Sequence, residues 1–217
     1  MADFTRERDA MVDSQIHTAD VTDRRLLKAF RTLPREKFVP RSRLALAYAD
    51  TEIETASGRF MMRPRDLSLL IHMVDIQPGE LVLNPASGRG YAAAVLSRMA
   101  ETVVCVEKDE TLVEKSSALL ADAGCDNAVV VQGDPANGMP GQGPYDVIFV
   151  EGGVEAPPRA WFDQLKDGGR LAVVISKGAI GKATVFQRSG DSIGQRVVFD
   201  SSPRLLPGFK REAGFVF

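Results

Sequence analysis

The amino-acid sequence predicts a doubly wound α/β fold with a mostly parallel sheet, and two observations carry this prediction. Short apolar runs alternate with helix-length segments from residue 81 to residue 175. One of these runs, 81–84, leads into a glycine-containing turn, 84–91, which opens onto an apolar helical segment. Because parallel strands are joined by right-handed crossovers that are usually helices, this alternation favours a sheet covered on both faces.

The segment before the sheet reads as a helical extension. Helices are expected over 4–16, 23–33 and 66–74, and the apolar residues of the second helix fall on one of its faces. We therefore expect a single domain over residues 1–217, in which residues 1–77 form a helical N-terminal extension and residues 78–217 form an α/β core.

In the core, strands are expected to alternate with helices, and the pattern changes towards the C-terminal end. Its alternating elements are strand 81–84, helix 91–99, strand 103–107, helix 110–123, strand 128–132, strand 144–150, helix 158–165 and strand 170–175. Three short strands follow at 184–188, 195–199 and 212–217 without a helix between them, so this end of the sheet should be antiparallel.

Composition excludes several classes of protein. The formal net charge of −2 gives no electrostatic case for binding nucleic acid or an anionic membrane. No apolar run approaches the roughly 20 residues that span a bilayer, and the charged N-terminus does not resemble a signal peptide, so a cytoplasmic location is expected. Two cysteines and two histidines predict neither a disulfide framework nor a metal site.

The turn over 84–91 reads Asn-Pro-Ala-Ser-Gly-Arg-Gly-Tyr and predicts a nucleotide-like ligand. Gly88 and Gly90 lack a Cβ, so the backbone can turn tightly there and approach a ligand closely. The start of the following helix offers free N–H groups. Glu107 ends the next strand 19 residues after Gly88, which is the usual spacing for a carboxylate that holds ribose hydroxyls. An adenosine-containing cofactor is therefore expected.

The glycine spacing also fits the dinucleotide pattern, so a NAD-binding fold is an alternative. Three features favour S-adenosylmethionine instead. Only about 110 residues follow Glu107, too few for a separate substrate domain. Gly133 and Asp134 end the third core strand, where a carboxylate can accept a hydrogen bond from an adenine amino group. The antiparallel finish suits a seven-stranded methyltransferase sheet.

Several segments carry a resemblance to a known family. Residues 34–40 read Pro-Arg-Glu-Lys-Phe-Val-Pro, a segment that methyltransferases in general lack. The other segments concerned are 11–16, 47–50, 88–91, 133–134, 144–146 and 164–171. Together they resemble the protein-L-isoaspartate O-methyltransferase family over nearly the whole chain. The resemblance implies a class I S-adenosylmethionine-dependent methyltransferase fold, and methyl esterification of isoaspartyl carboxylates in damaged proteins for repair.

The resemblance also implies which residues form the site. The implied cofactor-binding residues are Asn84, Ala86, Ser87, Gly88, Gly90, Tyr91, Glu107, Lys108, Gly133 and Asp134. Met62, Arg63 and Asn84 occupy the family's catalytic positions, with different side-chain chemistry at Met62 and Asn84.

At two places the sequence departs from the family pattern. The family turn begins with an acidic residue, an aliphatic residue and glycine, where this chain has Asn84, Pro85 and Ala86, so we expect weaker cofactor binding. Met62 stands at the position of a serine or threonine whose hydroxyl faces the substrate carboxylate, and methionine cannot donate that hydrogen bond.

The reaction itself needs no general base, because a carboxylate is already deprotonated. Loss of one orienting hydrogen bond to a charged group costs about 1.5–3 kcal/mol, and Arg59, Arg63 or Arg65 can in principle replace it by pairing with the carboxylate. Two alternatives stay open at this point: a methyltransferase with a changed substrate, and a non-catalytic binding protein built on the same fold.

Overall fold

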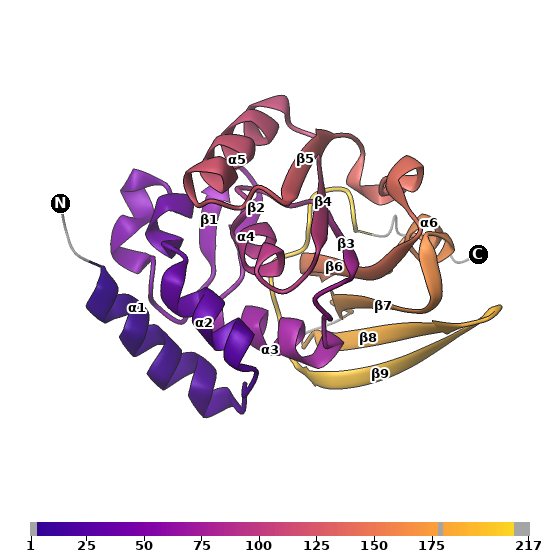
Figure 1. Ribbon diagram of the computed structural model, residues 1–217, viewed down its shortest axis with the longest axis horizontal. Coiled ribbons are helices and arrows are strands. Elements are labelled where there is room, and N and C mark those ends of the chain that lie inside the picture. The colour runs from indigo at the N-terminus through magenta and orange to yellow at the C-terminus, as the bar shows by residue number, and fades with distance from the viewer. Residues whose placement is uncertain (1–3, 178–179, 211–217) are drawn as a thin grey trace, which may run out of the picture.

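A seven-stranded sheet lies at the centre of the chain, which the computed structural model describes over residues 4–177 and 180–210 (Figure 1). Its strands are β3 (Leu81–Pro85), β4 (Thr102–Glu107), β5 (Ala128–Gln132), β6 (Tyr145–Val154), β7 (Leu165–Ile175), β8 (Lys182–Ser189) and β9 (Ser192–Asp200). Their order is β5-β4-β3-β6-β7-β8-β9. The first five in this order pair in parallel, and β8 and β9 pair antiparallel. The expected doubly wound sheet with an antiparallel C-terminal end is confirmed.

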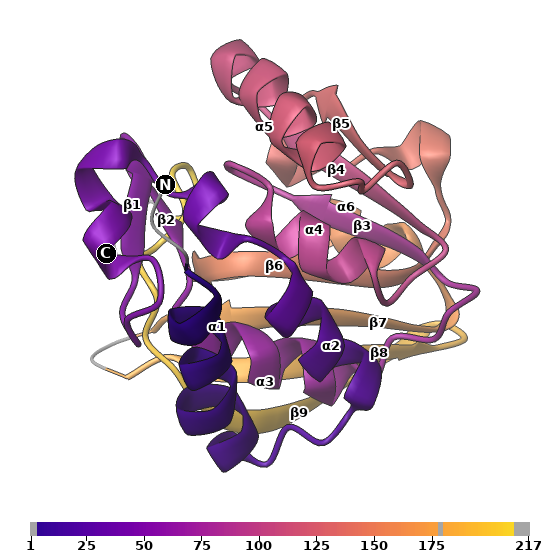
Figure 2. The ribbon, with the colours of Figure 1, turned by 60° about the vertical axis from the view of Figure 1, so that its left-hand side comes forward.

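Helices cover both faces of the sheet because its strands are apolar on both sides. The helices are α1 (Thr5–Met11), α2 (Arg24–Thr32), α3 (Pro64–Val74), α4 (Tyr91–Ser97), α5 (Glu110–Asp122) and α6 (Arg159–Asp163). Val82, Val103 and Val147 point into the core that contains the N-terminal helices, α3 and α4. Alternate residues such as Leu83 and Val104 point to the opposite core, around α6. Figure 2 shows α1, α2 and α3 stacked on one side of the strands.

Aspartates begin two of the helices, as their sequence suggests. The Asp23 side chain accepts hydrogen bonds from Arg25 N and Leu26 N at the start of α2. Asp109 accepts in the same way from Thr111 N and Leu112 N at the start of α5. Each carboxylate satisfies backbone N–H groups that have no partner within the helix.

The structure differs from expectation in a few elements. A hairpin of β1 (Ile53–Ala56) and β2 (Arg59–Met61), which the sequence did not suggest, lies beside the end of β6 (Figure 2). Strand β6 runs on to Val154, and α6 is shorter than expected because β7 already begins at Leu165. The strand expected over 212–217 lies outside the described residues.

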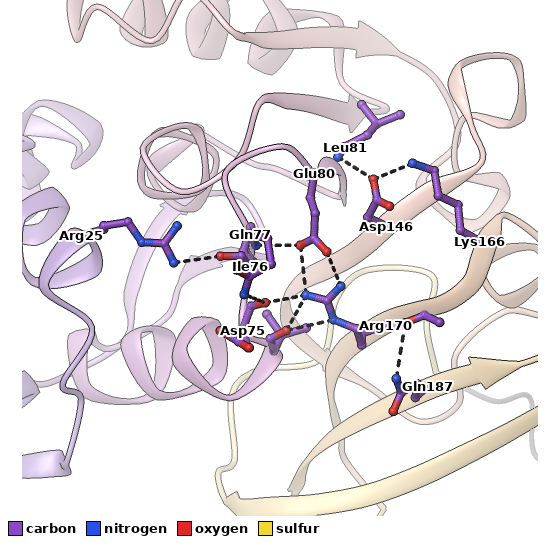
Figure 3. Close-up of polar contacts among 12 residues, drawn as sticks. Arg25, Asp75, Ile76, Gln77, Glu80, Leu81, Asp146, Lys166, Arg170 and Gln187 are labelled. Carbon is purple, nitrogen blue, oxygen red and sulfur yellow. Dashed lines mark hydrogen bonds and ion pairs between the residues drawn. The ribbon is translucent and has the colours of Figure 1, made fainter.

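A polar cluster fixes the end of the sheet where β3 begins (Figure 3). The Arg170 guanidinium of β7 binds the Glu80 carboxylate at 2.6 Å and the carbonyl oxygen of Val74 at 3.0 Å. Asp146 of β6 accepts from Leu81 N at 2.9 Å and from Lys166 Nζ at 2.7 Å. The end of α3 and the start of β3 are thus tied to the two neighbouring strands.

Two negative findings hold for the residues described above. No helix among them has the length and hydropathy to cross a bilayer. Within the same ranges no three histidine, cysteine, aspartate or glutamate side chains are grouped so as to hold a metal ion. Cys105 and Cys125 are both buried and unbridged.

Candidate functional site

The turn after β3 has the tight geometry that its glycines predicted. Gly88 and Gly90 have φ values of 57° and 88°, and Ala86 has a φ of 59°. An alanine in this left-handed region costs about 1–2 kcal/mol relative to the right-handed conformation. Ala86 N and Ser87 N both donate to Val106 O of β4, at 2.8 and 3.3 Å. These two bonds place the turn against the end of β4.

Glu107, at the end of β4, lies directly beside this turn. Its Oε2 accepts from Gly88 N at 2.9 Å and from Arg59 Nη2 at 2.6 Å. Its Oε1 accepts from the backbone N–H of Lys108 at 2.9 Å. The structure therefore brings Glu107 to the glycine turn, as its spacing suggested, and adds an arginine that the spacing did not suggest.

Arg59 comes from β2 and forms a buried ion pair with Glu107. The two side chains are 10% and 3% exposed. The Arg59 guanidinium also lies over the turn, since a methyl group added at Gly88 would stand 3.9 Å from its Nη2. Breaking such a pair by removing one partner is costly, because it leaves a buried charge without compensation.

Asp134 and Gly133 follow β5 on the same edge of the sheet. Asp134 Oδ1 accepts from Ala136 N at 3.1 Å and begins a short 3-10 turn. A side chain at Gly133 would approach Val106 Cγ1 to 3.2 Å, so the glycine serves packing between β4 and β5. Asp134 thus has a local structural role in addition to its place near Glu107.

Three hollows lie in a row at this edge. We call them the outer cavity, of about 350 Å³, the inner cavity, of about 10 Å³, and the polar cleft, of about 430 Å³. Glu107 and Asp134 border the outer cavity. Arg59 borders both the outer and the inner cavity, and Phe60 borders both the inner cavity and the polar cleft. Met62 borders the cleft. Arg59 therefore lies at the boundary between the outer and inner cavities, and Phe60 lies at the boundary between the inner cavity and the polar cleft.

Three polar side chains of the segment 84–91 are buried with unused hydrogen-bonding capacity. Asn84 Nδ2 donates to Phe149 O of β6 at 2.8 Å, a bond that the family's carboxylate could not make. Asn84 Oδ1, Ser87 Oγ and Tyr91 Oη have no hydrogen-bond partner in the part of the chain that the structure describes. Since buried polar atoms are normally paired, this arrangement suits a polar ligand next to the turn.

The arginines considered for the substrate carboxylate all have acidic partners. Arg59 is paired with Glu107. Arg63 Nε lies 2.9 Å from Asp66 Oδ2, and Arg65 Nη1 lies 3.0 Å from Asp66 Oδ1. None of the three offers an uncommitted positive charge beside Met62.

Arg35 was not anticipated as a site residue, although it lies in the most distinctive segment of the sequence. It is fully buried, and it donates from Nε to Ala47 O and from Nη2 to Met62 O, both at 2.8 Å. Its guanidinium lies 4.7 Å from the centre of the Tyr91 ring. Tyr91 is itself buried against aromatic residues of the extension and supports the glycine turn from behind.

Glu151 was also missed. It follows an apolar run in β6 and is 6% exposed. Its Oε1 accepts from Met62 N at 3.0 Å, and it borders the inner cavity. Burial raises the pKa of this carboxyl to about 7, against the lowering effects of the Met62 N–H and of Arg35 and Arg59. The Met62 backbone is therefore held on both sides, by Arg35 at its carbonyl and by Glu151 at its N–H.

Comparison with known proteins points to one family. The model of the protein-L-isoaspartate (D-aspartate) O-methyltransferase family matches residues 6–201. A protein-L-isoaspartate O-methyltransferase of Brucella anthropi is 36% identical over 175 residues, which is 81% of this chain and 80% of the relative. That of Roseiflexus castenholzii is 35% identical over 191 residues, or 88% and 87% of the two chains.

Solved structures agree with this result. A protein-L-isoaspartate O-methyltransferase structure superposes with a TM-score of 0.81 and 29% identity, over 93% of this chain and 66% of the other. A putative member from Plasmodium falciparum, in complex with S-adenosyl-L-homocysteine, gives a TM-score of 0.78 at 17% identity, over 92% and 97% of the two chains, and supports the fold alone. With the match over residues 6–201, these relatives show that the chain belongs to the protein-L-isoaspartate (D-aspartate) O-methyltransferase family, whose enzymes are S-adenosylmethionine-dependent O-methyltransferases with a class I fold.

Proposed function

We propose that this protein methyl-esterifies the free α-carboxylate of isoaspartyl residues, with S-adenosylmethionine as the methyl donor. The observation that carries the proposal is the row of three hollows at the carboxyl ends of β3, β4 and β6. The outer cavity and the polar cleft are both large enough for a ligand, and the glycine turn lies between them. We propose that the methyl donor and the acceptor bind on opposite sides of the glycine turn.

The outer cavity fits an adenosine group. Glu107 can accept hydrogen bonds from ribose hydroxyls, and Asp134 can accept one from the adenine amino group. Leu112 and Phe209 supply apolar walls for the rings. Lys108 borders this cavity, and Gly133 supports the strand end that carries Asp134.

The polar groups around the inner cavity suit the methionine end of the cofactor. The cavity itself is narrow in this conformation, with a volume of about 10 Å³. Ala86, Ser87, Gly88 and Gly90 form the turn that would hold this end, with Tyr91 behind it. Ser87 Oγ and Tyr91 Oη at this cavity, and Asn84 Oδ1 beside it, are buried polar atoms without a partner. The bound cofactor supplies a methyl group on a sulfonium centre. To admit it, the Arg59 side chain has to leave its place over Gly88.

The polar cleft is the proposed place of the isoaspartyl substrate. Met62 and Arg63 border it, together with acidic and basic side chains from the segment after β9 and the loop before β1. Because the attacking carboxylate is ionised at neutral pH, the protein has mainly to position it in line with the methyl group and to exclude water. We propose isoaspartyl-containing proteins and peptides as substrates, a cytoplasmic setting, and one domain in which the 1–77 extension covers the 78–217 core.

The function is tested by incubating the purified protein with an isoaspartyl peptide and S-adenosylmethionine that carries a labelled methyl group. We expect a base-labile methyl ester on the isoaspartyl peptide and none on a peptide of the same sequence with ordinary aspartate. Calorimetry with S-adenosylmethionine runs in parallel. Cofactor binding without ester formation would contradict the proposed substrate, and no binding at millimolar cofactor would contradict the proposal as a whole.

A change at Arg59 tests how the cofactor enters. We expect Arg59→Gln to bind S-adenosylmethionine at least about tenfold more tightly, a difference of about 1.4 kcal/mol, because no buried ion pair then has to be broken. Arg65→Gln is the matched control, since Arg65 is also paired with an acidic residue but borders none of the three hollows. Unchanged or weaker binding by Arg59→Gln would show that Arg59 does not obstruct the cofactor.

A further inference from the structure

Glu151 is a buried acidic group that borders the inner cavity and accepts a hydrogen bond from Met62 N. It ends the apolar part of β6, it borders the inner cavity, and it binds the backbone of Met62, which borders the cleft. A buried carboxyl group at this point is next to the place where the proposed donor and acceptor meet. Neither Met62 nor Phe60, which also lies there, can donate a side-chain hydrogen bond to a substrate.

Among residues 4–177 and 180–210, a hydrogen-bond donor is found for only one oxygen of Glu151. Oε1 accepts from Met62 N at 3.0 Å. No hydrogen bond to Oε2 is found among residues 4–177 and 180–210. A purely structural acceptor for the Met62 N–H needs a single oxygen, so the second oxygen is left to meet a ligand.

Burial and the nearby charges act on the pKa of Glu151 in opposite directions. Arg35, in the 3-10 turn Arg35–Phe38, and Arg59 of β2 favour the ionised form of Glu151. Glu52, in the loop before β1, disfavours that form. Burial is the largest influence and favours the neutral acid, with the result that the pKa stands at about 7. Arg35 and Arg59 make no ion pair with Glu151; Arg35 binds two carbonyl groups and Arg59 binds Glu107.

A neutral carboxyl group can do what Met62 cannot. When protonated it donates one O–H bond, and a carboxylate is the strongest acceptor that a protein substrate can present. When ionised it would repel that same carboxylate across a cavity of low dielectric constant. Ketosteroid isomerase shows that a protonated aspartate in an apolar site can serve as a hydrogen-bond donor in this way.

We propose that Glu151 is a substrate-binding residue whose protonated carboxyl group donates a hydrogen bond to one oxygen of the isoaspartyl carboxylate. This inference rests on the proposed function. The other carboxylate oxygen forms the new bond to the methyl carbon, while the sulfur–carbon bond breaks and its electron pair stays on sulfur. No proton moves in this step, and the Glu151 proton is still in place when the ester leaves.

The test measures binding of an isoaspartyl peptide to the full-length protein by calorimetry between pH 5.5 and 8.5. The peptide carboxylate is ionised throughout this range. We expect the affinity to fall about tenfold for each pH unit above about 7, and binding there to take up about one proton per peptide, seen as a dependence of the heat on the buffer. The kcat/KM for methyl transfer should fall with pH in the same way.

Variants of Glu151 separate this role from a structural one. Glu151→Gln keeps an acceptor for Met62 N and a permanent N–H donor for the substrate, so we expect substantial affinity with no pH dependence and no proton uptake. Glu151→Met provides neither an acceptor for Met62 N nor a donor for the substrate. It should bind the peptide at least about tenfold more weakly at pH 6. Glu54→Gln, an exposed acidic position on β1, is the control and should keep the wild-type pH profile.

The outcomes that overturn the inference are distinct from those that overturn the proposed function. A wild-type protein that methylates the peptide with a flat pH profile, or a Glu151→Gln variant that keeps the wild-type pH dependence, removes Glu151 from the substrate site and leaves the proposed function intact. A wild-type protein that neither binds nor methylates the isoaspartyl peptide at any pH overturns both. If Glu151→Met does not fold, the pH profiles of the wild type and of Glu151→Gln still decide.

Discussion

Replacing Glu107 with glutamine should cost the protein both its affinity for S-adenosylmethionine and a large part of its stability. The change leaves the Arg59 guanidinium, 10% exposed, without its partner. Removing one member of a buried ion pair typically costs about 3–5 kcal/mol. Hydrogen bonds from ribose hydroxyls to a charged acceptor add about 1.5–3 kcal/mol to binding. The absence of an ion pair to break returns about 1.4 kcal/mol of this, so the dissociation constant should rise by up to roughly tenfold. Urea denaturation and calorimetry measure the two effects.

A second variant separates these effects. In Arg59→Gln/Glu107→Gln no buried charge is left unpaired, so we expect the double variant to be more stable than Glu107→Gln alone. Its cofactor affinity should stay below that of Arg59→Gln, because the carboxylate is still missing. Glu110→Gln, an exposed change three residues along, serves as the control for loss of negative charge. Equal stability of the single and the double variant would show that an unpaired Arg59 charge does not destabilise the fold.

Arg35→Met should destabilise the protein by about 3 kcal/mol or more. The change leaves the carbonyl oxygens of Ala47 and Met62 buried without a donor, at about 1–3 kcal/mol each. It also removes the cation from the face of Tyr91. Because Arg35 positions Met62, whose N–H binds Glu151, methyl transfer should fall as well. The midpoint and slope of urea denaturation give the stability change.

Arg41→Met is the matched control for this change, since Arg41 is an exposed arginine a few residues along the same segment. We expect its effect on the denaturation midpoint to stay within about 0.5 kcal/mol. Arg35→Lys should fall between the two, because an ammonium keeps the charge but cannot reach both carbonyl groups in the planar geometry of a guanidinium. An Arg35→Met protein as stable as Arg41→Met would refute the structural role of Arg35.

The sequence predicted the parts of the site that depend on local pattern and on strand order. A glycine turn after one strand and Glu107 at the end of the next must come together in a parallel sheet, because the carboxyl ends of neighbouring strands share an edge. The tight turn at Ala86, Gly88 and Gly90 follows from the same local pattern, and the structure confirms it.

The contacts that the sequence did not predict are long-range ones. Arg59 meets Glu107 across 48 positions, and Met62 meets Glu151 across 89. Both depend on the β1–β2 hairpin, whose strands of four and three residues are too short to give a periodic signal. The visible sign of Glu151 was an acidic residue at the end of an apolar strand, and the sequence analysis used that sign for Glu107 and Asp134 but not for Glu151.

The departure at Asn84 illustrates why substitution within a pattern is hard to judge from the sequence. The sequence indicates only that a carboxylate is missing. In the fold, the Asn84 amide donates to Phe149 O of the neighbouring strand, which a carboxylate could not do. The residue therefore has a structural task that becomes visible only when β3 and β6 are side by side.

The polar cluster at the start of β3 has a consequence for how the molecule moves (Figure 3). Arg170 and Asp146 anchor the strands at the end of the sheet opposite to the glycine turn, so thermal fluctuations should have their smallest amplitude there. Amide hydrogens of β3, β6 and β7 should accordingly exchange with solvent only through opening of the whole domain, whereas those of the β1–β2 hairpin should exchange through local opening. The sheet would then act as a fixed base, from which the hairpin carrying Arg59 and Met62 can lift without unfolding the core.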